Sequence, residues 1–214
     1  MRLDEKIAML DRMRRIKAQE EREEEQVEKK KLTIEEAREG IQNKKIELED
    51  GLVLEFDIKP YFKEELPFVI FKNFYQASQE EESGFILVNR DKNVSQIVTW
   101  GEEQRQANTV DQWANLLVNG MAANRMYANI TKKVSLNFLE YICFEVPAKD
   151  SSVWNILFRF KEQWLGFAGN YNCMQQDVDK YGLFLEAMVI ELDDWMQQKK
   201  GVEQDGVEER SDNV

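Results

Sequence analysis

The residue types that most often carry out chemistry in proteins are scarce in this sequence. Histidine is absent from all 214 residues, which excludes histidine-based catalytic triads, histidine general bases and histidine-ligated metal sites. The two cysteines, Cys143 and Cys173, lack the CxxC spacing of metal and redox motifs. We therefore expect this chain to hold no metal ion and no cofactor.

The two thiols differ in their sequence surroundings. Cys143 stands inside an apolar run and is predicted to be a small buried hydrophobe, whereas Cys173 follows a strand-like run and is predicted to be more exposed. As a nucleophile, Cys173 would need a histidine or a cationic neighbour to lower its pKa, and the sequence shows neither. Residues 167–173, Phe-Ala-Gly-Asn-Tyr-Asn-Cys, either form a turn or line a ligand pocket.

Adjacent carboxylates occur in two places, at Glu102 and Glu103 and at Asp193 and Asp194. Paired carboxylates perform acid–base catalysis when burial separates their pKa values. Neighbouring residues on a helix do not face each other, so we expect both pairs to be solvated surface groups. The sequence therefore predicts no catalytic residues and no enzyme.

The net charge of −12 at pH 7 argues against a nucleic-acid partner, because phosphate binding needs a basic surface. It suits a basic protein partner. Residues 1–15 lack the apolar core of a signal peptide, and no apolar run is long enough to cross a membrane. The expectation is a cytoplasmic protein that binds a protein and no membrane.

The elements that position any site are expected to centre on residues 134–195, which hold most of the apolar residues. Three segments are rich in aromatic and β-branched residues, as strands are: 136–146, 153–160 and 164–171. A long helix is predicted to follow, because apolar residues recur at helical spacing. They are Val178, Tyr181, Leu185, Met188, Leu192 and Trp195. Gly201 is a helix stop signal.

The second and third of these strands are close enough in sequence to form a hairpin. A short turn would set Phe158 opposite Phe167 and place aromatic and apolar residues along one face. The other face of the third strand carries small side chains beside a tryptophan, namely Trp164, Gly166, Ala168 and Asn170. Small residues permit close approach of another backbone, which belongs either to a covering helix of this chain or to a partner peptide in a groove.

The N-terminal residues 1–32 are predicted to form a charged helical arm, because they contain neither glycine nor proline. Leu3, Ile7 and Leu10 share one face of this helix. The arm either docks on its own domain or on a sister copy, giving a homo-oligomer, or it recruits a separate partner. Residues 33–45 form a short helix and connector, opened by a capping box of Thr33 and Glu36.

The remaining strands are joined mainly by hairpins. In the first, a three-residue loop ending at Gly51 sets Ile46 opposite Leu54. Residues 85–89 and 94–100 form a second hairpin after a polar loop at 76–83, and Thr109 opens a helix. Hairpin connections indicate an antiparallel sheet with helices against it. We therefore predict an α+β fold, an α/β/α sandwich over residues 46–200, with a disordered acidic tail at 201–214.

This order of elements resembles the PsbP/DcrB-like fold, a family of small α/β/α sandwiches. The residues that carry the resemblance are the opening hairpin 46–56, the strand 94–100 before the helix 109–121, and the closing strands and helix 136–195. The family includes photosystem accessory proteins, DcrB-type proteins and chaperones for type VI secretion effectors. The resemblance implies a binding or assembly factor without a catalytic site.

Three functional hypotheses follow. The first is a non-enzymatic interaction module, an adaptor or chaperone associated with bacterial secretion, which binds through the small-residue face or the arm. The second is an immunity protein that blocks the basic active site of a toxin with acidic surface. The third is a histidine-free enzyme or small-ligand-binding protein, which would need a deep pocket with a buried carboxylate or thiol.

Overall fold

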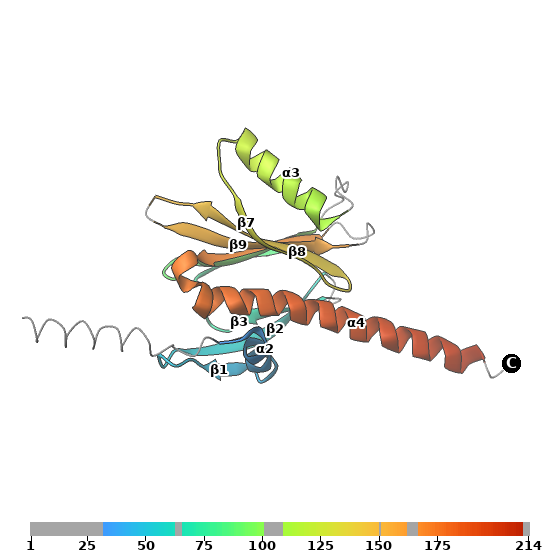
Figure 1. Ribbon diagram of the computed structural model, residues 1–214. Coiled ribbons are helices and arrows are strands. Elements are labelled where there is room, and N and C mark those ends of the chain that lie inside the picture. The colour runs from blue at the N-terminus through green and yellow to red at the C-terminus, as the bar shows by residue number, and fades with distance from the viewer. Residues whose placement is uncertain (1–31, 63–65, 101–108, 150, 162–166, 212–214) are drawn as a thin grey trace, which may run out of the picture. The chain divides into compact units, whose positions relative to one another are not determined.

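The computed structural model describes residues 32–62, 66–100, 109–149, 151–161 and 167–211, with only the backbone for residues 167 and 200–211. Among these residues the chain has an α+β fold with two antiparallel sheets, one of three strands and one of seven (Figure 1). The predicted fold class is confirmed. The predicted arm residues Leu3, Ile7 and Leu10 lie outside the described residues, and so do Trp164 and Gly166 of the predicted small-residue face.

The three-stranded sheet has the order β1-β2-β3. Its strands are β1 (Lys45–Glu47), β2 (Val53–Tyr61) and β3 (Leu66–Phe71). The predicted register of the first hairpin is confirmed, since Ile46 pairs with Leu54 and Gly51 has a φ of 78°. The capping box of Thr33 and Glu36 is also present, and it opens α2 (Ile34–Gln42).

The seven-stranded sheet has the order β4-β5-β6-β10-β9-β8-β7, and every neighbouring pair is antiparallel. Its strands are β4 (Ala77–Glu81), β5 (Gly84–Asn89), β6 (Val94–Trp100), β7 (Asn129–Ser135), β8 (Leu139–Pro147), β9 (Ser152–Phe160) and β10 (Phe167–Met174). The predicted β5–β6 hairpin is confirmed, with Asn89 opposite Val94.

The two edge strands of this sheet differ from the prediction. β4 occupies residues expected to be a polar loop, and β7 was not predicted at all. Both strands carry mainly exposed polar side chains, because an edge strand pairs on one side only and does not need two apolar faces. The strand predicted from residue 136 begins at Leu139, since residues 136–138 turn the chain from β7 into β8.

The register between β9 and β10 is shifted by two residues from the expected one. Phe158 lies opposite Gly169, and not opposite Phe167. A Cβ atom at Gly169 would lie 2.1 Å from Cζ of Phe158, so the aromatic ring covers the glycine. The shift keeps every side chain on the expected face, because side chains alternate with a period of two.

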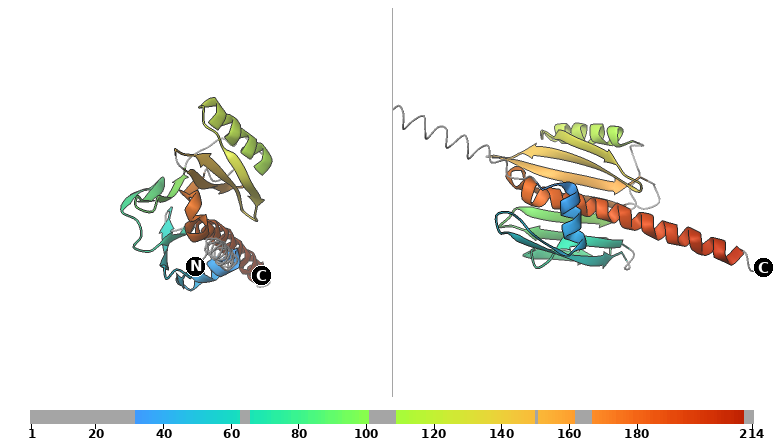
Figure 2. Two further views of the ribbon diagram at one scale, coloured as in Figure 1. Left: turned by 60° about the vertical axis from the view of Figure 1, so that its left-hand side comes forward. Right: turned by 60° about the horizontal axis from the view of Figure 1, so that its bottom comes forward.

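The last helix, α4 (Leu183–Ser211), lies between the two sheets (Figures 1 and 2). It follows a short 3₁₀ turn at Gln175–Asp177 and a π-helical turn at Val178–Gly182. Its backbone continues through residues 201–211, where the sequence predicts a helix stop and a disordered tail.

The predicted helical stripe is confirmed for Tyr181, Leu185, Met188 and Leu192, all of which are buried. Phe184 and Ala187, outside that stripe, are buried too, and the Phe184 ring lies 5.4 Å from that of Phe56 in β2. Residues 184–189 are all buried, so this part of the helix must have partners on more than one side; they are α2 and β3 on one side and β9 on the other (Figure 1).

Helix α3 (Val110–Ala123) packs on the opposite face of the seven-stranded sheet, over β7 and β8 (Figure 1). Its predicted stripe of Trp113, Leu117 and Met121 packs against Ile142 and Phe144 of β8. The seven-stranded sheet thus has a helix on each face. No helix within the described ranges is long and apolar enough to span a lipid bilayer.

Candidate functional site

The seven-stranded sheet has one sealed face and one partly open face. We call the face toward α4 the inner face and the face that carries α3 the outer face. On the inner face Val98, Ile156 and Phe158 are completely buried. On the outer face α3 covers the β7–β8 side, whereas Ile86 of β5 is 38% exposed and Thr99 of β6 is also exposed.

We call the exposed part of the outer face the open half, and we define it by the side chains that share it on four neighbouring strands. They are Gln79, Glu81, Ile86, Ile97, Thr99, Ala168 and Asn170. Directly paired residues of neighbouring strands share a face, and Ala168 pairs with Thr99 while Asn170 pairs with Ile97. Two of the predicted partner-binding residues, Ala168 and Asn170, therefore lie on the β10 side of the open half.

Asn170 has an unusual environment for an amide. Its Oδ1 atom is buried and accepts no hydrogen bond from any residue that the structure describes. A buried polar atom without a partner costs about 1–3 kcal/mol. The Asn170 amide oxygen is therefore an acceptor left unpaired among the described residues, on the strand at the border of the open half.

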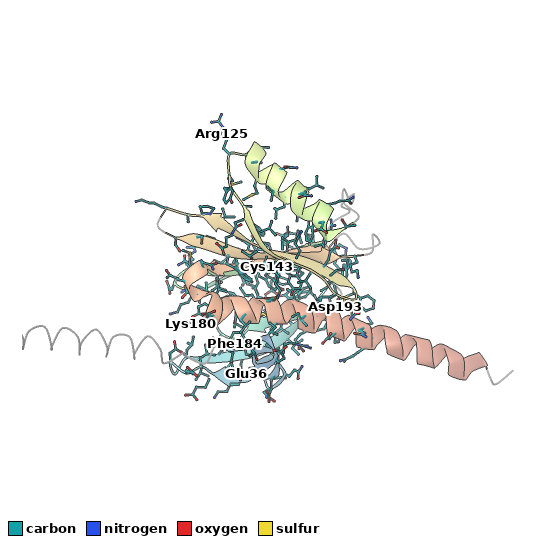
Figure 3. The ribbon with its side chains drawn as sticks, viewed as in Figure 1. Glu36, Arg125, Cys143, Lys180, Phe184 and Asp193 are labelled. Carbon is teal, nitrogen blue, oxygen red and sulfur yellow. The ribbon has the colours of Figure 1, made fainter. Side chains whose placement is uncertain are left out.

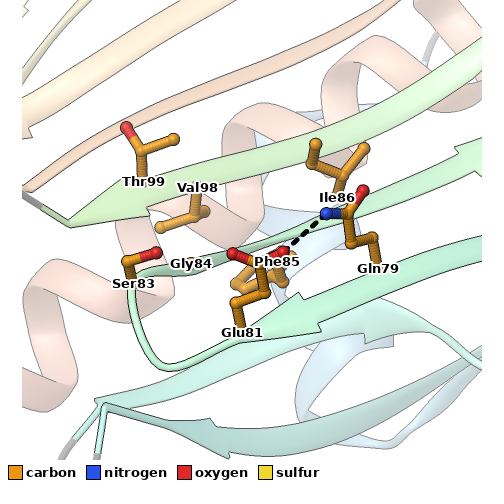
Figure 4. A pocket seen from close by; sticks show the side chains of 8 residues that line it. All are labelled: Gln79, Glu81, Ser83, Gly84, Phe85, Ile86, Val98 and Thr99. Carbon is orange, nitrogen blue, oxygen red and sulfur yellow. Dashed lines mark hydrogen bonds between the residues drawn. The ribbon is translucent and has the colours of Figure 1, made fainter.

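The open half contains a shallow hollow where β4, β5 and β6 run side by side (Figure 4). Its lining residues are Gln79, Glu81, Ser83, Gly84, Phe85, Ile86, Val98 and Thr99. Nε2 of Gln79 donates a hydrogen bond of 2.7 Å to Oε1 of Glu81, which holds the carboxylate on one wall. Sequence reasoning missed this feature because it assigned residues 76–83 to a loop.

A salt bridge and a tryptophan separate the open half from the part under α3. The Arg159 guanidinium donates to Oε1 of Glu140 at 2.6 and 2.8 Å and lies 4.2 Å from the ring centre of Trp113 on α3. Trp113 therefore reaches over β9. The next strand, β10, presents small or polar side chains on this face, among them Ala168, Asn170 and Asn172.

The edges of the sheet are poor places for an added strand. β4 carries Glu80 and Glu81, and β7 carries Lys132 and Lys133 next to a β-bulge. Charged side chains and bulges at sheet edges disfavour pairing with another chain. A partner is therefore better accommodated on the open half than at either edge.

The carboxylates inside the molecule are structural groups. Asp193 is 1% exposed and accepts the backbone N–H groups of Asn137, Phe138 and Leu139 at 3.1, 2.7 and 2.7 Å (Figure 3). The prediction that Asp193 is a solvated surface group is wrong. Asp194, its neighbour, is partly exposed and pairs with Arg38 of α2.

A second buried carboxylate, Glu186 on α4, accepts a hydrogen bond from the Tyr141 hydroxyl at 2.5 Å and a further one from the amine of Lys132. Burial, together with the hydrogen bond to Glu186, raises the pKa of Tyr141 well above its ordinary value. The three groups satisfy one another and link β7 and β8 to α4. We assign them to stability.

Both thiols are buried and face the inner side of the sheet. The prediction is confirmed for Cys143 and is wrong for Cys173, which is 0% exposed. Burial raises the pKa of Cys173 to about 12 and also raises the pKa of Cys143. A protonated thiol without solvent access is a poor nucleophile at neutral pH.

Within the described ranges, no cluster of three or more histidine, cysteine, aspartate or glutamate side chains could hold a metal ion. No protein-family model, no curated protein and no solved structure matches this chain. The geometry of the open half is therefore the main guide to function.

Proposed function

We propose that this chain is a non-enzymatic protein-interaction module, an adaptor or chaperone, that binds its partner on the open half. The observation that carries the proposal is the unequal covering of one sheet. The inner face and the β7–β8 side are packed, while Ile86, Thr99 and the unpaired Asn170 amide oxygen remain on the open half.

The character of the open half supports a protein partner. Ile86 and Ile97 lie side by side at its centre, and amide, hydroxyl and carboxylate groups surround them. An apolar centre with a polar rim is typical of protein interfaces. The resemblance to PsbP/DcrB-like proteins, which implies binding and not catalysis, agrees with this proposal and stays a prediction.

The burial of the reactive side chains supports a binding role over an enzymatic one. The thiol of Cys173 and the carboxylates of Glu186 and Asp193 are packed or hydrogen-bonded within the protein. An enzyme needs such a group beside a pocket that admits its substrate. The hollow on the open half contains one carboxylate, that of Glu81, and it is shallow and open to solvent.

A matched pair of substitutions tests the proposal. Ile86 in β5 is 38% exposed on the open half, and Ile58 in β2 is 51% exposed on the other sheet. The wild-type chain, Ile86→Lys and Ile58→Lys would each be used to capture partners from the source lysate, with mass spectrometry as the readout. We expect one dominant protein to bind the wild type and Ile58→Lys and to be lost with Ile86→Lys. Equal capture by all three chains would contradict the proposal.

We also propose that the module works in a reducing cytoplasm. Both cysteines are free and buried, an arrangement that needs no oxidising compartment. A fluorescent fusion imaged in the source cells would reveal the location, and export of the fusion would refute this assignment.

A further inference from the structure

The hollow on the open half has an arrangement of side chains that goes beyond a generic binding surface. Three paired residues cross it from strand to strand: Glu81 of β4, Gly84 of β5 and Thr99 of β6. Neighbouring strands lie about 4.8 Å apart. The backbones of Glu81 and Thr99 therefore stand two strand spacings apart, about 10 Å, and the residue between them, Gly84, has no side chain.

Gly84 keeps this gap open. Its φ is 154°, and a Cβ atom there would lie 2.2 Å from the carbonyl oxygen of Val98. No larger residue can occupy the position without moving β6. The space between Glu81 and Thr99 is thus a fixed feature of the backbone, and the Ser83 hydroxyl lies at its end (Figure 4).

The charge of the hollow has one sign. Glu81 is the single ionisable side chain among the residues that line it. The hydrogen bond from Gln79 orients the carboxylate without neutralising it. The whole chain carries a net charge of −12, so the surrounding field also attracts cations.

The apolar wall of the hollow complements this charge. Ile86 lines the hollow, and Ile97 pairs with it on the next strand. Lysine and arginine side chains lay their aliphatic stems along apolar surface while the charged end reaches a carboxylate. The Ser83 hydroxyl also lines the hollow and can accept a hydrogen bond from such a cation, whereas the Thr99 hydroxyl donates to the carbonyl oxygen of Ala168 in β10 at 3.4 Å.

We propose that the hollow receives a lysine or arginine side chain of the protein partner, with an apolar side chain of the same segment seated on Ile97. The inference rests on the proposed function and names the chemistry of the partner. The docking segment is one in which a basic residue stands close to an apolar residue.

The test uses the full chain and random short peptides displayed on phage. Peptides are selected against the wild type at low salt and depleted against Ile86→Lys. The binding of an enriched peptide is then measured by calorimetry to the wild type, Glu81→Gln and Glu82→Gln. Glu82 is an exposed carboxylate on the adjacent turn and is not among the residues that line the hollow, so it is the matched control.

We expect enriched peptides to combine a lysine or arginine with apolar residues. Glu81→Gln should weaken their binding by about tenfold, as the loss of one charge-assisted hydrogen bond implies. Glu82→Gln should change it by less than about twofold, since Glu82 does not line the hollow. Added salt should weaken binding to the wild type more than binding to Glu81→Gln.

The failure of this inference differs from the failure of the proposed function. Peptides that need Ile86 but lack a basic residue, or that bind Glu81→Gln as tightly as the wild type, would overturn the cation site and leave the open half as a binding surface. If the depletion against Ile86→Lys removes every selected peptide, or if no peptide is selected, both proposals are overturned.

Discussion

The inner and outer faces of the seven-stranded sheet are built from the same strands and have different surroundings. On the inner face, α4 packs against the sheet, and the Tyr61 ring of β2 stacks 4.2 Å from that of Phe85 in β5. Gln96 is completely buried on this face, and its Nε2 atom donates a hydrogen bond of 3.1 Å to the carbonyl oxygen of Val69 in the other sheet. On the outer face, α3 covers one side of the sheet only.

The two faces therefore have different roles: the inner face stabilises the fold, and the open half of the outer face is available for binding. Packed apolar surface on the inner face holds the two sheets and α4 together, and a change there costs folding free energy. The open half contributes little to folding, because Ile86 and Thr99 already contact solvent. The side chains of the open half can therefore serve binding at little cost in folding free energy.

The largest expected contrast is in thiol reactivity. Cys173 is buried on the inner face, whereas Thr99 is exposed on the outer face. In mildly alkaline buffer, the native thiol of Cys173 should react with iodoacetamide at least about a thousandfold more slowly than in the unfolded chain, because labelling requires unfolding. A Thr99→Cys variant should react at this position as fast in the native state as when unfolded. Rapid native labelling of Cys173 would refute the sealed face.

Truncation of a core aromatic side chain is the next largest effect. Phe158→Ala should lower the free energy of unfolding by about 4 kcal/mol, because it opens a cavity above Gly169 on the inner face. Ile86→Ala on the open half should cost less than about 1 kcal/mol. Urea titrations followed by circular dichroism measure both values, and similar losses would contradict the assignment of the two faces.

The neighbouring carboxylates of α4 provide an intermediate case. Asp193→Asn should cost about 2 kcal/mol, because one amide oxygen cannot accept the three backbone N–H groups that the carboxylate accepts. Asp194→Asn removes a partly exposed ion pair with Arg38 and should cost less than about 1 kcal/mol. The same urea titration distinguishes them, and equal costs would show that Asp193 does not anchor the turn.

The smallest effects belong to the open half. Ile86→Lys and Glu81→Gln should each change the free energy of unfolding by no more than about 0.5 kcal/mol, since exposed positions tolerate substitution. The binding changes expected of the same variants are much larger. A loss of stability well above that limit in either variant would place the residue in the core and withdraw it from the proposed surface.

The sequence was most informative where one local pattern decides the structure. The Ile46–Leu54 pairing follows from Gly51, and the starts of α2 and α3 follow from Thr33 and Thr109. It was least informative for edge strands: the Ala-Ser-Gln-Glu-Glu run of β4 has no apolar alternation to indicate a strand.

Tertiary contacts explain the other differences. The β9–β10 register depends on the Phe158 ring lying over Gly169, and the burial of Asp193 depends on a turn far away in sequence. For the candidate site, sequence reasoning placed Ala168 and Asn170 on a small-residue face. It could not place Glu81, because β4 was not recognised as a strand. In the sequence, the apolar residues Phe184 and Ala187 fall outside the predicted stripe of α4. They were the available signal that a second sheet packs against this helix.

The Asp193 anchor also constrains how the chain folds as it leaves the ribosome. The carboxylate that completes the β7–β8 turn lies 54 residues after Leu139. At about 5–20 residues per second, it is synthesised roughly 3–11 s later. Every described strand precedes α4 in the sequence, so the inner faces of both sheets are translated before the helix that covers them. The nascent chain must therefore keep this apolar surface from aggregating until α4 emerges.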